Sequence, residues 1–257
     1  MENDIIAIVM AAGKGTRMKS KNSKLVQKIY GKEIVKRAVE NAQKAGVRDI
    51  VAVVGYKKEE VMKVLGDNIK YAYQDEMLGT GHAVMQAKEY LKGKKGKVLV
   101  LNGDVPLVRP ETLNKLIEKS IENKEYATLL TAIYDDPTGY GRIVRDEGGN
   151  IEGIVEEKDT TPEQKKIKEI NAGIYCFDIE ALLKALEKVT PNNKQGEYYI
   201  TDVIQIMNDS GLKTGAVLVE DNTEILGIND RIQLGILTKV LQMRINTELM
   251  KNGVTIE

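Results

Sequence analysis

Short apolar runs alternate along the chain with segments whose apolar residues recur every three to four positions. Five runs rich in Val, Ile, Leu and Ala predict β-strands: IIAIVMA (5–11), DIVAVVG (49–55), IKYAYQ (69–74), KVLVLNGD (97–104) and ATLLTAIY (127–134). The segments between them predict helices at 34–45, 57–66, 81–93 and 111–123. Strands and helices that alternate at this spacing indicate an α/β fold, with a mostly parallel sheet that has helices on both faces.

The pattern changes after residue 135. GRIVRDEGGNIEGIVEEKD (141–159) predicts a hairpin that turns at EGGN, and EINAGIYCFD (169–178) predicts a further strand. We therefore expect residues 135–180 to form an antiparallel addition laid over the edge of the sheet. Residues 229–251 have a long helical pattern, which predicts a C-terminal helical arm.

Composition narrows the possible functions. The chain has 257 residues, of which 42% are apolar, with 38 Lys and Arg against 38 Asp and Glu. This balance argues against a nucleic-acid binder that works by bulk electrostatics. We expect no membrane association, because no apolar stretch approaches the roughly 20 residues of a membrane span. The single cysteine, Cys176, predicts a reducing cytoplasm and is expected to be a small buried hydrophobe rather than a catalytic thiol.

The stretch VMAAGKGTRMKSKNSKLV places two glycines, Gly13 and Gly15, directly after the first predicted strand. Exposed backbone amides at such a turn can converge on an anion. The spacing fits neither the dinucleotide fingerprint nor the Walker A loop, and the glycines alone are also compatible with a plain structural turn. Arg17 and Lys24 follow closely and could reach back over the loop, which favours a phosphate site.

Several motifs resemble a known family and occur in its order. They are GTGHA (79–83), GDVPL (103–107), GYGRIV (139–144), GIVEEKD (153–159), EINAGIY (169–175), QGEYYITD (195–202) and GIND (227–230). Essentially the whole chain resembles the N-terminal half of the bifunctional N-acetylglucosamine-1-phosphate uridyltransferase/glucosamine-1-phosphate acetyltransferase family. The AAGKGTRM loop is shared with the wider sugar-nucleotide pyrophosphorylases.

The resemblance implies a Rossmann-like fold of the nucleotide-diphospho-sugar transferase type. We expect a nucleotidyltransferase domain over 1–228 and the helical arm over 229–257. The family's full protein continues into a β-helix that carries the acetyltransferase and forms trimers. We expect that part to be absent from this chain, and the chain to be mostly a monomer. Two positions depart from the family pattern, with Ser23 in place of a proline and Gln27 in place of a histidine.

The implied reaction joins UTP and N-acetyl-glucosamine 1-phosphate to give UDP-N-acetylglucosamine and pyrophosphate. The sugar phosphate attacks the α-phosphorus in line with the leaving pyrophosphate, without a covalent intermediate, so catalysis is positioning and charge neutralisation. The chain has one histidine, His82, which excludes a multi-histidine metal site, and we expect no Ser-His-Asp triad. We expect His82 to be a packing residue at the start of a helix.

The resemblance also assigns roles to individual residues. Arg17 and Lys24 are the implied catalytic cations, and the implied nucleotide-binding residues are Ala11, Ala12, Gly13, Gly15, Gln74, Gly79 and Thr80. The implied sugar-binding residues are Gly141, Glu156, Asn171 and Asn229. Asp104 and Asn229 are the implied ligands of Mg²⁺. For these two residues helix or turn capping is the alternative, and Glu156 could be an ordinary surface glutamate.

Three other functions remain open at this stage. The first is a pyrophosphorylase that makes UDP-glucose, dTDP-glucose or a CDP-polyol, although GYGR, EINAGIY and GEYYITD favour an acetamido sugar. The second is a glycosyltransferase, but these usually carry an Asp-x-Asp motif and NGDVP has one aspartate. The third is a non-catalytic regulatory module, which would tend to lose the signature cations or the metal ligands.

Overall fold

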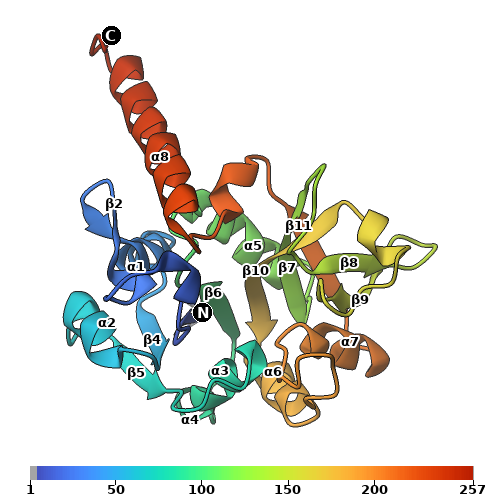
Figure 1. Ribbon diagram of the computed structural model, residues 1–257. Helices are drawn as coiled ribbons and strands as arrows, with labels where there is room; N and C mark the ends of the chain where they lie inside the picture. The colour runs from blue at the N-terminus through green and yellow to red at the C-terminus, as the bar shows by residue number, and fades with distance from the viewer. Residues whose placement is uncertain (1–4, 257) are drawn as a thin grey trace.

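The computed structural model describes residues 5–256, and these residues build one large mixed sheet (Figure 1). Its strands run in the order β11-β7-β10-β6-β1-β4-β5, and β8 and β9 extend it beside β10. Their bounds are β1 (Ile6–Ala11), β4 (Asp49–Val54), β5 (Lys70–Tyr73), β6 (Lys97–Asn102), β7 (Ala127–Ile133), β8 (Arg142–Arg145), β9 (Ile151–Val155), β10 (Glu169–Asp178) and β11 (Thr214–Leu218). A separate small hairpin pairs β2 (Lys28–Ile29) with β3 (Lys32–Glu33).

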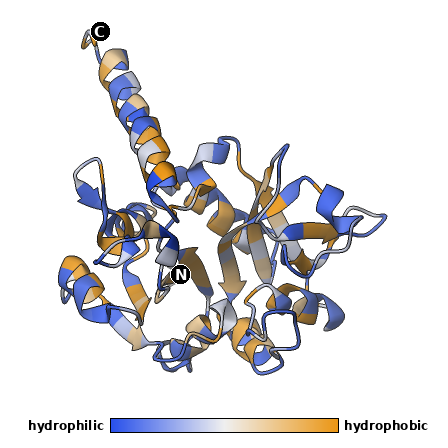
Figure 2. Ribbon diagram, in the orientation of Figure 1, coloured by the Kyte–Doolittle hydropathy of each residue, from blue (hydrophilic) through white to orange (hydrophobic). Residues whose placement is uncertain are grey.

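The helices cover both faces of this sheet. Their bounds are α1 (Ile34–Lys44), α2 (Lys58–Leu65), α3 (Thr80–Gln86), α4 (Lys88–Leu91), α5 (Pro110–Glu122), α6 (Ile179–Leu186), α7 (Asp202–Asp209) and α8 (Arg231–Lys251). One buried cluster joins α1, α2 and α5 to the sheet, and a second cluster joins α3, α4, α6 and α7 to it. The strands between them are buried on both sides, so they are apolar along most of their length (Figure 2).

The five predicted α/β strands are confirmed, each with ends within two residues of the prediction. The predicted helices are also confirmed, and the structure divides the third into α3 and α4 at Ala87. Parallel pairing joins β1 to β4 and β6, β4 to β5, and β7 to β11. Because parallel strands bring their carboxyl ends to one edge, the loops after β1, β5 and β6 meet there.

The strand β10 differs from the expectation of an addition that spans residues 135–180. In this region only β8 and β9 form an addition to the sheet, as a hairpin attached to β10. The strand β10 itself runs antiparallel between β6 and β7 within the sheet. The physical reason is burial on both faces: Ile174 and Cys176 belong to one apolar cluster, and Tyr175 and Phe177 belong to the other. Cys176 is fully buried, and this burial raises the pKa of its thiol to about 11, so it is a core residue as predicted.

The C-terminal helix α8 projects away from the sheet (Figure 1). On this helix the side chain of Leu237 is buried in the core, while those of Ile232, Ile236 and Met243 are exposed. Within residues 5–256, no helix combines the length and apolar character needed to cross a bilayer.

Candidate active site

Two adjoining cavities open at the carboxyl ends of β1, β5 and β6. The first has a volume of about 270 Å³ and the second about 320 Å³. Both are lined by Met10, Thr80, Asn102 and Asp104, so together they form one cleft. Predicted site residues in the first cavity are Ala12, Gly13, Lys24, Gln74, Gly79, Thr80 and Asp104, and those in the second are Arg17, Thr80, Asp104, Gly141, Glu156, Asn171 and Asn229.

Two predicted residues do not line the cleft. Ala11 is buried at the end of β1 and packs in the core. Gly15 lies against the side chain of Lys24, where it has a φ of 58°. A Cβ atom added at Gly15 would come within 2.8 Å of the Lys24 stem, so only glycine allows this close approach. Gly13 has no such neighbour within 4 Å and is exposed at the cavity.

The segment that carries Lys24 forms a single 3₁₀ turn over Lys24–Val26. Ser23 caps this turn, because its hydroxyl accepts a hydrogen bond from the Leu25 amide at 3.3 Å. The Ser23 amide in turn donates to Glu60 at 2.7 Å, and the Gln27 side chain donates to Ser20 at 3.2 Å. The two departures from the family pattern are thus accommodated by local hydrogen bonds that hold the backbone of Lys24.

The Lys24 ammonium lies between two side chains that are distant in sequence. It donates to Asp104 Oδ2 at 2.6 Å and to Asn229 Oδ1 at 3.0 Å. The Lys24 side chain is 11% exposed and that of Asp104 is 22% exposed. Because both partners of the Lys24–Asp104 contact carry a charge, it is a charge-assisted hydrogen bond that links two loops across the cleft.

The capping alternatives for Asp104 and Asn229 do not fit the geometry. The N-cap of α8 is Asp230, whose carboxylate accepts from the Gln233 amide at 2.8 Å. Asn229 instead donates its backbone amide to the Gln233 side chain at 2.7 Å, which leaves its own side-chain oxygen on Lys24. The backbone of Asp104 accepts from Ile228 at 2.9 Å, so the two loops are joined directly.

These two oxygens are suited to a hard divalent cation. Within residues 5–256, no three His, Cys, Asp or Glu side chains gather as a metal site. One carboxylate and one amide oxygen nevertheless face the same point, and that point already holds a positive charge, the ammonium of Lys24. A cation that takes its remaining ligands from phosphate and water needs few protein ligands, and Asp104 and Asn229 could supply them.

At the far end of the first cavity, the side chain of Gln74 is held in one orientation. Its amide nitrogen donates to Gly79 O at 3.0 Å and lies 3.2 Å from His82 Nδ1. His82 also contacts Gln86 at 3.0 Å. It is therefore a supporting residue of α3, in agreement with the expected packing role, and it fixes the amide that faces the cavity.

Two of the sequence motifs, GTGHA and GEYYITD, pack on each other. The Gly81 amide donates to Tyr198 O at 2.7 Å, and the Thr80 hydroxyl accepts from the Ile200 amide at 3.1 Å. A Cβ atom at Gly79, where φ is 112°, would lie 2.5 Å from Tyr198 O. Glycine is thus required at this position, and the two motifs form one wall of the first cavity.

The second cavity is lined by Gly141 just before β8, by Glu156 just after β9, and by residues of β10. Asn171 is 9% exposed and donates to the Tyr175 hydroxyl at 2.7 Å. The half-buried carboxylate of Glu156 accepts from Thr201 at 3.1 Å. Burial raises the pKa of Glu156, and the Thr201 hydrogen bond only partly opposes this. Glu156 is therefore not an ordinary surface glutamate.

Arg17 lies exposed at the mouth of the second cavity. Its guanidinium has no hydrogen bond or ion pair with the rest of the chain over residues 5–256. It is thus available to an anionic ligand, as a residue with planar, bidentate donors.

Sequence reasoning missed Asn102, which lines both cavities. A Cβ atom at Gly173 would lie 2.2 Å from Asn102 Nδ2, and Gly173 has a φ of 69°. The available signal was a polar residue at the end of an apolar strand, immediately before the GDVPL motif.

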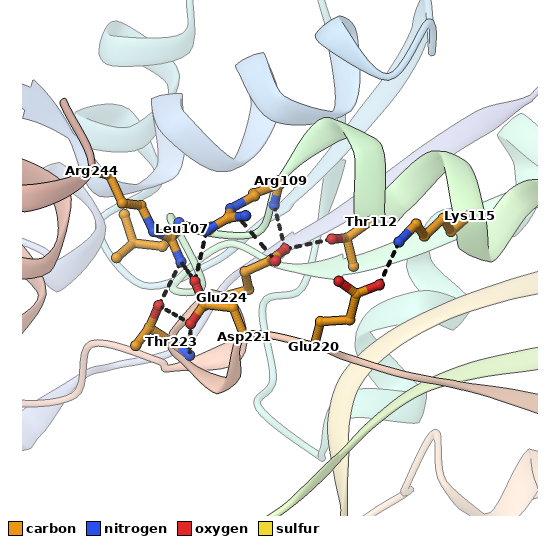
Figure 3. A network of polar contacts seen from close by, with 9 residues as sticks. All are labelled: Leu107, Arg109, Thr112, Lys115, Glu220, Asp221, Thr223, Glu224 and Arg244. Atoms are coloured by element: carbon orange, nitrogen blue, oxygen red, sulfur yellow. Dashed lines mark hydrogen bonds and ion pairs between the residues drawn. The ribbon is translucent and has the colours of Figure 1, made fainter. Parts of the chain in front are cut away.

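A network of polar contacts among residues outside the two cavities joins three segments (Figure 3). Arg244 of α8 donates to Leu107 O at 2.8 Å and to Asp221 at 3.0 Å. The backbone amide of Arg109 donates to the buried Glu224 at 2.9 Å. The loop after Asp104, the segment before Asn229 and the helix α8 are therefore fixed to one another.

The sequence matches the nucleotidyl transferase family over residues 6–224. Similar proteins include the bifunctional protein GlmU of Caldanaerobacter subterraneus, 52% identical over 98% of this chain, and that of Acetivibrio thermocellus, 50% identical over 98%. The chain spans only 55% of the length of each. A crystal structure of a putative glucose-1-phosphate thymidylyltransferase from Bacillus anthracis has a similar fold, with a TM-score of 0.75, 20% identity and coverage of 92% of this chain and 94% of that one. The match over residues 6–224 and the similarity to these relatives show that the chain belongs to the nucleotidyl transferase family.

Proposed function

We propose that this chain joins UTP and N-acetyl-glucosamine 1-phosphate, giving UDP-N-acetylglucosamine and pyrophosphate. The observation that carries this proposal is the meeting of two cavities at Asp104, with Lys24 and Asn229 at the same point. A nucleotide in one cavity and a sugar phosphate in the other would bring their phosphates together there. The GlmU relatives and the motif resemblance support this choice of substrates.

The first cavity suits a uracil base. The Gln74 amide directs its NH₂ group toward Gly79 O and His82 Nδ1, and the Gln74 oxygen remains to accept a hydrogen bond from a ligand. Uracil offers an N–H at N3, whereas cytosine has a lone pair there. A flipped amide would place its oxygen against Gly79 O, so this orientation favours uracil over cytosine.

The phosphates would be bound by the glycine loop and by two cations. The exposed backbone at Gly13 can donate to phosphate oxygens. Arg17 can bind the leaving pyrophosphate with two parallel hydrogen bonds. Lys24 can place its charge between the two substrates, where negative charge shifts during the transfer.

Asp104 and Asn229 would hold Mg²⁺. When bound, Mg²⁺ neutralises charge on the triphosphate and orients the α-phosphate. The sugar would bind in the second cavity, where Asn171 and Glu156 can hydrogen-bond its hydroxyls. Close packing at Gly141, where a Cβ atom would meet Ile154 at 3.0 Å, leaves backbone to contact the acetamido group.

Pyrophosphate release across a grid of substrates tests this function. UTP, dTTP and CTP are each paired with the 1-phosphates of N-acetyl-glucosamine, glucose and galactose, and kcat/KM is measured. We expect the UTP and N-acetyl-glucosamine 1-phosphate pair to be preferred over every other pair. A preference for dTTP with glucose 1-phosphate would instead support the thymidylyltransferase alternative, and no turnover with any pair would support a binding module.

A variant pair checks that the measured activity belongs to this cleft. Losing a directed cation typically costs about 10²–10³ in rate, so Lys24→Ala should reduce turnover by that factor. Lys36 is an exposed residue of α1, and Lys36→Ala should leave turnover unchanged. Equal rates for the two variants would show that Lys24 is not in the site.

A further inference from the structure

The position of the Lys24 ammonium is unusual for a residue expected to bind phosphate. Both of its hydrogen-bond partners, Asp104 and Asn229, are the oxygens that would hold the divalent cation. The ammonium therefore satisfies the same two acceptors that the cation needs. No other basic side chain contacts either oxygen within residues 5–256.

The rest of the Lys24 side chain is fixed in this direction. Its aliphatic stem lies against Gly15, so closely that a Cβ atom there would be 2.8 Å from two of its carbons. The side chain is only 11% exposed. The contact with Asp104 thus belongs to a packed arrangement rather than to a mobile surface lysine, and only the end of the side chain has room to move within the first cavity, which it lines.

The divalent cation and the Lys24 ammonium compete for the same side chains and repel each other. A Mg²⁺ ion lies about 2.1 Å from a ligand oxygen, so an ion on Asp104 Oδ2 would stand within about 5 Å of an ammonium that is itself 2.6 Å from that oxygen. Like charges at this separation in a partly buried site repel strongly. Since both also compete for Asn229, the cation binds much more weakly while Lys24 keeps these partners than after it has turned to others.

We propose that Lys24 acts as an internal counter-ion that keeps the divalent cation out of the site until a triphosphate is bound. This inference rests on the proposed function, because a nucleotide in the first cavity is what supplies the ammonium with new anionic partners. When Lys24 turns to the phosphates, Asp104 and Asn229 are released together. Metal and nucleotide then enter as one complex, and the free protein has a low affinity for the metal alone.

The test measures metal binding without any substrate. Mn²⁺ serves as the probe, and the free Mn²⁺ signal is followed by electron paramagnetic resonance during titration of the nucleotide-free protein. Lys24→Met keeps the length of the side chain and removes its charge, so it should bind Mn²⁺ at least about tenfold more tightly than the wild type. Lys36→Met, which removes an exposed charge on α1, should bind Mn²⁺ as the wild type does.

A double variant shows whether the added Mn²⁺ affinity depends on the Asp104 carboxylate. Lys24→Met combined with Asp104→Asn should lose the added affinity, because the carboxylate is then missing. Mn²⁺ should also raise the melting temperature of Lys24→Met more than that of the wild type, since a ligand that binds only the folded state stabilises it. Lys24→Gln provides a second neutral variant if Lys24→Met does not fold.

Equal Mn²⁺ affinity in the wild type and both neutral variants would overturn the inference. So would a gain that persists in the double variant. Because no nucleotide or sugar is present, this outcome is independent of the substrate grid: an active wild type with no gain in Lys24→Met overturns only the counter-ion role. A clear gain with no turnover in the grid supports the counter-ion role and contradicts the proposed reaction.

Discussion

At the scale of single residues, the cleft depends on two glycines that let segments approach closely. Gly15 accommodates the stem of Lys24, and Gly79 accommodates the backbone of Tyr198. Both have positive φ angles, which other residues rarely adopt. A side chain at Gly15 would therefore displace Lys24, and one at Gly79 would displace the backbone of Tyr198. This steric requirement explains why AAGKGTRM and GTGHA have glycine at these two positions.

The proposed metal ligands give a prediction at the same scale. Asp104→Asn keeps the shape of the side chain and removes its charge, so turnover should fall by about 10² or more. Asn229→Ala should have a smaller effect, because water can replace a neutral ligand. A magnesium titration of turnover should show partial rescue of both variants by mass action.

Thermal melting of the same proteins separates a lost ligand from a lost fold. Both variants should melt close to the wild type, since both side chains are at the surface of the cleft. Normal turnover of Asp104→Asn at low magnesium would show that the carboxylate holds no metal.

Much of this site could be predicted from motifs, but its contacts could not. The motifs predicted Lys24, Asp104 and Asn229 as site residues by resemblance. Their mutual hydrogen bonds join positions that are 80 and 205 residues apart, so they depend on the folded loops rather than on local pattern. The same holds for the orientation of Gln74, which is set by Gly79 O and His82.

At the scale of elements, α8 is attached to the domain by the network in Figure 3. Arg244 donates to Leu107 O, Asp221 and Thr223 at 2.6–3.0 Å. Burial alone would raise the pKa of Asp221, but hydrogen bonds from Thr223 and the charges of Arg244 and Arg109 bring it below its ordinary value. The network therefore stabilises the ionised carboxylate and, through it, the segment that leads to Asn229.

Replacing Arg244 tests this attachment. Arg244→Met removes three partly buried hydrogen bonds and should lower the free energy of unfolding by about 1–3 kcal/mol. Lys115→Met is the matched control, because the Lys115–Glu220 pair is exposed, at 60% and 84% for the two side chains, and such exposed pairs contribute little to stability. Chemical denaturation measures both. Equal losses would mean that the Arg244 network adds no more than a surface pair.

Periodicity predicted most elements, but it could not give their neighbours in the sheet. The apolar run of β10 is compatible with an edge addition or with a central strand, and only packing on both faces decides between them. Five of the strands and α-helices described above were not predicted: α6, α7, β11 and the two short strands of the β2–β3 hairpin. For α6 a signal was present, because Asp178 caps the helix by accepting from the Ala181 amide at 3.0 Å ahead of an apolar 3.6-residue pattern.

At the scale of the whole molecule, Asp202 links folding stability to pH. Burial raises the pKa of Asp202 to about 6, and the nearby charge of Asp159 adds to the effect. The folded protein therefore binds more protons than the unfolded chain between about pH 4 and pH 6, so this group lowers stability as the pH rises through that range. Above it, the full cost of the buried charge is present.

Asp202→Asn should remove this dependence. Relative to the wild type, the variant should gain about 1 kcal/mol between pH 4.5 and pH 7.5, after allowance for partial exposure. This corresponds to roughly 2–4 °C in melting temperature for a domain of this size. Melting curves over the pH range measure it, with Asp209→Asn, an exposed change on the same helix, as control. A constant difference from the wild type across the range would contradict the assignment.

The central place of β10 has a consequence for how the two cavities depend on each other. This strand is hydrogen-bonded on one edge to β6, whose last residue Asn102 lines both cavities, and on the other edge to β7, while it also carries Asn171 of the second cavity. Neither set of strands can come apart without leaving the other with an open edge of unpaired backbone groups. The two cavities thus share one strand, so a local opening that separates β10 from β6 or from β7 would disturb the walls of both.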